Sequence, residues 1–145
     1  EPFLIEYNVR MGDPECQTIL PKLKTDFLEI IRACTNQNLD TIDFEWHNKK
    51  SLCIVLCSRG YPDKYKNDIE IENLKSIILK KDEFIFHAGT KNRELKIYSN
   101  GGRVLNFVIL SEDFAKSRNN AIELINKIKW SNGFFRKDIG FKVIN

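Results

Sequence analysis

The sequence lacks any apolar stretch approaching the ~20 residues of a membrane span, and no signal-peptide pattern opens it. It also lacks a block of like charges: 23 Lys and Arg are scattered among 20 Asp and Glu, for a net charge of +3. Such a balance is too small to indicate nucleic-acid binding. We therefore expect a cytoplasmic protein that binds neither membranes nor nucleic acids.

Cysteine is scarce, and none of the four cysteines forms a C-x-x-C pair. Without that spacing we do not expect a zinc site. Cys53 and Cys57 are four residues apart in an apolar run, so they would fall on one face of a strand as small core residues. In the cytoplasm these thiols are expected to stay reduced.

What the chain does contain is typical of a folded domain. It has 145 residues, of which 42% are hydrophobic and 30% are charged, which excludes a disordered chain and suits one ordinary domain. The sequence starts at Glu1 and Pro2 without a Met and enters a strand pattern almost at once. We therefore expect a piece of a larger protein.

The first 45 residues predict one strand and two helices. Residues 3–9 have the pattern of a buried strand, and residues 11–15 form a turn. A short helical piece follows near residues 16–20 and is stopped by Pro21. A longer helix begins after Asp26, with an apolar stripe at i, i+3, i+4 and i+7.

The remaining residues are dominated by strand patterns. The Asn-Gly-Gly sequence at 100–102 predicts a hairpin turn, because Asn and Gly tolerate positive φ. An amphipathic helix is predicted over residues 113–129, with Ser111 or Asp113 as N-cap. The predicted strands are residues 51–57, 83–87, 93–98, 104–110 and 141–144, the last of them closing the sheet.

Two oxygen-bearing side chains at the start of the chain suggest metal chemistry. If residues 3–9 form a strand, Glu6 and Asn8 point to the same face. Hard cations such as Mg²⁺ take one or two such oxygens and fill their other positions with phosphates and waters. Arg10 and the turn containing Asp13 follow at once, a combination typical of a phosphate-handling site.

Residues 5–15, IEYNVRMGDPE, resemble the signature of the phosphoribosylamine–glycine ligases, which are ATP-grasp enzymes of purine synthesis. The similarity continues, in order, along essentially the whole chain. The further segments are GYP at 60–62, FHAGT at 86–90, NGGRVL at 100–105 and FRKDIG at 135–140. Met11 and the pair Ser58-Arg59 depart from the usual pattern.

The resemblance implies an α+β fold and a reaction. Residues 1–45 would be the C-terminal end of an ATP-grasp domain, and residues 46–145 a mostly antiparallel, β-rich C-terminal domain with a packed helix. The complete enzyme would join phosphoribosylamine to glycine, using ATP and Mg²⁺ (or Mn²⁺). The N-terminal part of such an enzyme has no counterpart in this sequence, so we expect that part as a partner and no activity from this chain alone.

The resemblance also implies roles for particular residues. Glu6 and Asn8 would bind the metal, with a further carboxylate ligand supplied from outside this chain. Arg10 would stabilise charge on the transferring phosphoryl group, and Asp13 would contact the ribosylamine. The alternatives are that Glu6 and Asn8 are solvated at a strand end or cap the next helix, and that Arg10 forms a surface salt bridge. Asp13 would then be a turn residue, followed by Glu15 as an early-helix carboxylate favoured by the helix dipole.

Lys91 and Arg103 are candidates for binding the substrate phosphate. Each follows a glycine-containing turn, where backbone N–H groups can also point at an anion. The alternative is that both are simply exposed cations. For the whole chain, a second hypothesis is a non-catalytic module that keeps only the ribosyl-phosphate half-site. A carboxylase tail of the same superfamily is disfavoured by the Gly-Asp-Pro-Glu turn.

Overall fold

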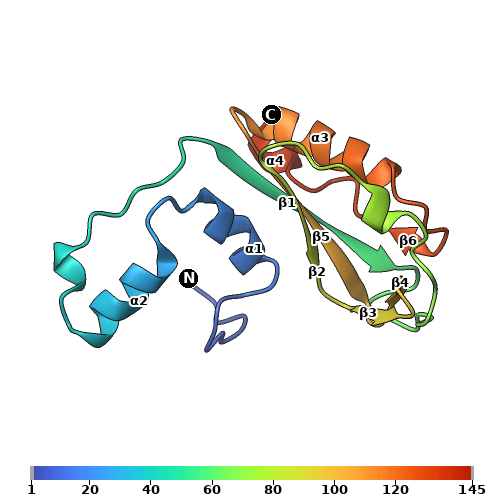
Figure 1. Cartoon of the computed structure of the whole chain (residues 1–145), viewed down its shortest axis with the longest axis horizontal. Helices are drawn as coiled ribbons and strands as arrows, with labels where there is room; N and C mark the ends of the chain where they lie inside the picture. Colours follow the sequence, from blue (N-terminus) through green and yellow to red (C-terminus); the bar gives the residue numbers. More distant parts are fainter. Residues whose placement is uncertain (1, 145) are drawn as a thin grey trace.

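A four-stranded antiparallel sheet organises the computed structural model, which describes residues 2–144. Its central strands are β1 (Lys50–Ser58) and β5 (Arg103–Ser111), and its edges are β2 (Glu83–His87) and β6 (Gly133–Phe134), in the order β2-β5-β1-β6. Figure 1 shows this sheet between helix α3 and the N-terminal helices. The other elements are α1 (Glu15–Ile19), η1 (Leu20–Lys22), α2 (Phe27–Thr35), η2 (Leu39–Thr41), η3 (Leu74–Ser76), β3 (Thr90–Arg93), β4 (Lys96–Ser99), α3 (Phe114–Asn126) and α4 (Phe141–Ile144).

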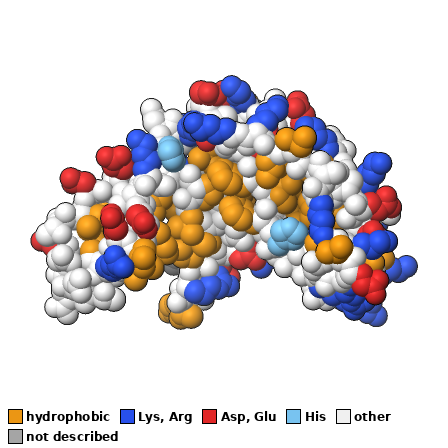
Figure 2. Space-filling view, in the orientation of Figure 1, with side chains coloured by type: hydrophobic (Ala, Val, Ile, Leu, Met, Phe, Trp, Pro, Cys, Tyr) orange, Lys and Arg blue, Asp and Glu red, His pale blue; other side chains and the backbone are white. Residues whose placement is uncertain are grey.

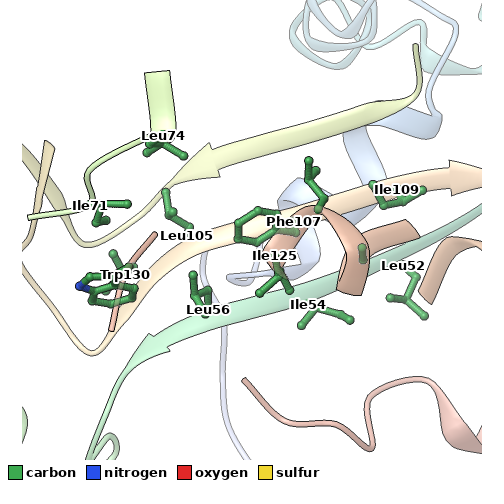
Figure 3. Packing of buried hydrophobic residues seen from close by; sticks show 13 residues of the cluster. Leu52, Ile54, Leu56, Ile71, Leu74, Leu105, Phe107, Ile109, Ile125 and Trp130 are labelled. Atoms are coloured by element: carbon green, nitrogen blue, oxygen red, sulfur yellow. The ribbon is translucent and has the colours of Figure 1, made fainter. Parts of the chain in front are cut away.

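The core lies between the sheet and α3. Alternate residues of the two long strands meet across the pairing, with Ile54 opposite Phe107 and Leu56 opposite Leu105. Because side chains alternate across a strand, these residues share one face of the sheet. Figure 3 shows them packed together with Ile125 of α3. This apolar layer fixes the register of the pairing, since a one-residue slip would turn it outward.

Helix α3 begins and packs as its sequence predicts. The Asp113 carboxylate accepts a hydrogen bond from the Lys116 N–H at 2.6 Å, so Asp113 rather than Ser111 is the N-cap. Ala121, Leu124 and Ile125 are buried against the sheet. The strands predicted at 51–57, 83–87 and 104–110 are likewise confirmed as β1, β2 and β5, and the α+β fold class is confirmed.

Helix α1 contacts β1 and β5, and the Ser51 hydroxyl donates a hydrogen bond of 2.7 Å to the Thr18 carbonyl. Helix α2 is capped by Asp26, whose carboxylate accepts from the Leu28 N–H at 2.8 Å. Its apolar stripe is largely uncovered, and only Ala33 of this helix is buried. The pattern therefore predicted the helix correctly, while most of its apolar surface faces outward.

The strand predicted for residues 3–9 is wrong for this structure. The segment has no regular secondary structure, and the side chains of Ile5 and Val9 are 93% and 100% exposed. A strand needs a hydrogen-bonded neighbour, and no strand of the described residues pairs with this segment. The segment is apolar and would be expected to be buried, but no other part of the described chain covers it.

The hairpin turn was predicted at the wrong place. Strand β3 pairs with β4, and the chain reverses at Glu94 and Leu95, with φ of 48° and 67°. Residues 100–102 instead connect β4 to β5, which belong to different sheets. The glycines there permit close approach, because a Cβ on Gly102 would lie 2.0 Å from a ring carbon of Tyr61.

Replacing Gly102 by alanine should therefore destabilise the chain by about 1–3 kcal/mol, the usual cost of overpacking. Gly12→Ala is the matched control, because its Cβ would meet only the flexible end of the Glu15 side chain. That variant should stay within about 0.5 kcal/mol of the wild type. Denaturant unfolding of the two variants measures the difference, and equal stabilities would contradict the proposed packing of Tyr61 on Gly102.

The strand predicted for residues 141–144 is also wrong. These residues form the short helix α4, and β6 occupies the sheet edge beside β1. Gly140 precedes the helix with φ of 82°, a left-handed backbone that redirects the chain. No helix in the described residues is long and apolar enough to cross a membrane.

Candidate functional site

The side chains of Glu6, Asn8 and Arg10 are brought together without a strand. The Asn8 amide donates to the Glu6 carboxylate at 2.6 Å. Arg10 Nη1 donates to the Asn8 side-chain oxygen at 3.0 Å and to the Met11 carbonyl at 2.9 Å. All of these contacts are exposed to solvent. The side chains that were predicted to lie together are hydrogen-bonded to each other, although the strand expected to align them does not form.

This cluster fits part of a magnesium shell. Carboxylate and amide oxygens are hard donors, and Mg²⁺ commonly takes only one or two from a protein. The Asn8 oxygen currently accepts from Arg10, so a cation would compete with that guanidinium. No group of three or more His, Cys, Asp or Glu suited to a metal occurs within residues 2–144. Further ligands would have to be water, substrate oxygens or groups from elsewhere.

Arg103 contacts Asp13 across 90 residues of sequence. Its Nη1 donates to the Asp13 carbonyl at 2.7 Å, and its Nη2 lies 3.3 Å from the Asp13 carboxylate. Gln17 donates to the other carboxylate oxygen at 2.9 Å. The guanidinium at the start of β5 therefore holds the turn that leads into α1. Since Arg has five N–H donors, it retains capacity for an anion.

Lys91 lies apart from this pair. Its ammonium group forms an ion pair with Asp68, which also lies 3.2 Å from Arg93 Nη1. The hydrogen bond from Lys91 holds the pKa of Asp68 below its ordinary value. Asp68 was missed by sequence reasoning, although its place beside Asn67 in a polar loop fits its left-handed φ of 63°.

A groove of about 760 Å³ lies beside the turn that Arg103 holds. Phe84 and Phe86 of β2 form part of its wall, with their rings stacked at a centroid distance of 6.0 Å. The other lining residues are Arg10, Met11, Gly12, Asp13, Cys16, Gln17, Leu20, Pro21 and His87. Figure 2 shows hydrophobic side chains gathered between the N-terminal helices and the sheet. Of the six predicted site residues, only Arg10 and Asp13 line this groove.

The thiols near the sheet are poor nucleophiles. Burial raises the pKa of Cys53 to about 12, and burial likewise raises that of Cys57, against the opposing charge of Arg103. His87 is engaged through Nδ1 with the Thr90 hydroxyl at 2.8 Å. Among the described residues, the groups that lie near the groove are therefore suited to positioning a ligand and neutralising its charge.

Comparison with known proteins gives consistent results. The family model for the phosphoribosylglycinamide synthetase C domain matches residues 51–142. A phosphoribosylamine–glycine ligase of Caldanaerobacter subterraneus is 44% identical over 95% of this chain and 32% of its own length. The bifunctional purine biosynthetic protein purD of Dictyostelium discoideum is 42% identical over 98% of this chain and 18% of its own length.

The fold is also that of a solved structure. The crystal structure of phosphoribosylamine–glycine ligase from Thermotoga maritima superposes with a TM-score of 0.78 and 31% identity, over 97% of this chain and 34% of that one. The chain therefore spans about a third of the phosphoribosylamine–glycine ligases it matches.

Proposed function

Because the chain belongs to the phosphoribosylamine–glycine ligase family, we propose that it is the C-terminal part of an enzyme making glycinamide ribonucleotide. The proposed reaction consumes phosphoribosylamine, glycine and ATP, and releases ADP and phosphate. The glycine carboxylate would first be phosphorylated, and the ribosylamine nitrogen would then attack the acyl-phosphate. The observation that carries this proposal is the Glu6–Asn8–Arg10 cluster next to a groove bounded by Asp13.

In this proposal the chain divides near residue 45. Residues 1–45 complete an ATP-grasp domain, and residues 46–145 form the C-terminal unit built on the sheet. The uncovered apolar segment before Gly12 suits the first assignment, since an unpaired extended segment can add to another sheet. The two parts meet at the Asp13–Arg103 contact.

The side chains act by positioning and by neutralising charge. Glu6 and Asn8 would hold Mg²⁺, which when bound supplies positive charge beside the ATP phosphates. Arg10, already oriented by Asn8 and the Met11 carbonyl, would donate to the transferring phosphoryl oxygens. Asp13 would contact the ribosylamine from the wall of the groove.

Arg103 and Lys91 would bind the substrate phosphate, and they differ in the contacts that each already makes. Arg103 needs only its unused N–H donors, because one Nη1 proton is donated to the Asp13 carbonyl and Nη2 makes only a 3.3 Å ion pair with the carboxylate. Lys91 must exchange Asp68 for the phosphate. The support is therefore stronger for Arg103 than for Lys91.

A direct test compares the 145-residue chain with the longer enzyme that contains it. The chain alone should form no measurable glycinamide ribonucleotide, whereas the longer enzyme should release ADP only when phosphoribosylamine and glycine are both present. Robust product formation by the chain alone would contradict the proposal that the reaction also requires the N-terminal part of the enzyme. An inactive longer enzyme that still binds ribose 5-phosphate would favour the non-catalytic binding module instead.

A further inference from the structure

A second pocket lies just beyond the C-terminal end of β1 and shares no lining residue with the groove. It has a volume of about 410 Å³ and is lined by Arg59, Lys64, Tyr65, Lys66 and Asn132. Three of these five side chains are cationic, and none is acidic. The volume falls within the range of small-molecule sites.

The cations of this pocket are not neutralised by the protein. Within residues 2–144, none of Arg59, Lys64 and Lys66 forms a salt bridge. The nearby Asp68 is already engaged by Lys91 and Arg93. Three like charges around one small cavity repel each other, and an anion placed among them would relieve that repulsion.

The pocket also contains a polar group without a partner. The side-chain nitrogen of Asn132 is buried and makes no hydrogen bond. A buried donor without a partner costs free energy that a bound acceptor would recover. Rotation of the Asn132 side chain, which lines the pocket, would present this donor to an anion held by the guanidinium of Arg59.

The backbone around the pocket is fixed by several contacts. The Arg59 N–H donates to the Asn132 carbonyl at 2.8 Å, which joins the two sides of the pocket. Gly60 has φ of 102°, and a Cβ there would lie 2.1 Å from the Lys64 carbonyl, so the loop folds back tightly on itself. The Tyr61 and Tyr65 rings pack at 6.2 Å. Arg59 and Lys64 are thereby held on a defined loop.

We propose that this pocket binds a small phosphorylated ligand, with a diphosphate as the best match to its charge. Arg59 provides a planar fork, Lys64 and Lys66 provide point charges, and Asn132 provides a neutral donor. Figure 2 shows Lys and Arg side chains, mixed with some carboxylates, at the end of the molecule where Figure 1 places this loop. The small net charge of +3 favours a compact anion over a long polyanion.

The site is separate from the proposed catalytic groove. None of its lining residues belongs to the groove or to the Glu6–Asn8–Arg10 cluster. Arg103, the proposed phosphate ligand of the reaction, is also not among them. The proposal can therefore fail while the proposed function stands, and the reverse also holds.

Calorimetric titration of the 145-residue chain with inorganic pyrophosphate tests the proposal. At about 50 mM salt, where exposed charges are weakly screened, saturable binding of one equivalent is expected. Arg59→Ala should weaken it at least about tenfold, which corresponds to 1.4 kcal/mol. Arg59→Lys should recover part of the loss, because it restores the charge without the fork.

Two further variants make the test decisive. Lys142→Ala removes an exposed cation of α4 and should change affinity by less than about twofold, which excludes a general charge effect. Arg103→Ala is the second variant, because it distinguishes this pocket from the phosphate site proposed for the reaction. Circular dichroism confirms that each variant is folded. The proposal is overturned if no saturable binding occurs, if Lys142→Ala weakens it as much as Arg59→Ala, or if binding is lost with Arg103→Ala and kept with Arg59→Ala.

Discussion

Replacing Glu6 by alanine in the complete enzyme is expected to reduce turnover by about a hundredfold or more. The change removes the charged member of the proposed metal ligand pair, together with the acceptor of the 2.6 Å bond from Asn8. Stability should change by less than about 0.5 kcal/mol, because the side chain is exposed and makes no core contact. Steady-state kinetics at several Mg²⁺ concentrations and denaturant unfolding measure the two effects.

Two companion variants separate charge from shape. Glu6→Gln keeps a group that can accept from Asn8 but lacks the negative charge, so its turnover should fall nearly as far as that of Glu6→Ala. Glu112→Ala removes an exposed carboxylate paired with Lys116 at 2.9 Å, remote from the groove, and should leave turnover unchanged. Wild-type activity of Glu6→Ala at ordinary Mg²⁺ concentrations would mean that Glu6 binds no metal.

The second large effect is expected at Arg103. In the complete enzyme, Arg103→Ala should raise the Michaelis constant for phosphoribosylamine roughly ten- to a hundredfold, since each charge-assisted contact contributes about 1.5–3 kcal/mol. The constants for ATP and glycine should move little. Arg103→Lys should recover only part of the loss, because a point charge cannot reproduce a two-pronged contact.

The contact with Asp13 gives this prediction a competing explanation. If Arg103 acts only by holding the turn before α1, its loss would disturb Arg10 and the metal cluster, and the Michaelis constant for ATP would rise instead. Arg136→Ala is a suitable control, since this arginine pairs with Asp138 at 2.6 Å on an exposed loop. That variant should leave all three Michaelis constants unchanged.

Local patterns in the sequence predicted much of the fold. The apolar runs of β1 and β5, the cap of α3 and the cap of α2 are decided within a few residues, so their positions could be deduced. The segment 3–9 could not, because its state depends on a partner strand and not on its own composition. The hairpin turn at Glu94 and Leu95 could not be predicted, because neither residue type usually adopts the left-handed backbone conformation found there.

The site was predictable to a similar degree. The spacing of Glu6 and Asn8 correctly placed their side chains together, even though the assumed strand did not form. The pairing of Asp13 with Arg103 joins residues 90 apart, and that of Lys91 with Asp68 depends on how a long loop folds. Neither contact can be deduced from neighbouring residues in the sequence. Only the folded chain shows that Arg103 contacts Asp13 whereas Lys91 is paired with Asp68.

The order of strands in the sheet has a consequence for synthesis on the ribosome. Within residues 2–144, strand β1 pairs with β5 and β6, both of which come later, and the residue opposite Leu56 is Leu105. At typical rates of translation, roughly 2 to 10 seconds pass before that partner is made. During this interval an apolar central strand has no hydrogen-bonded neighbour in the sheet, and an unpaired apolar strand is prone to aggregation.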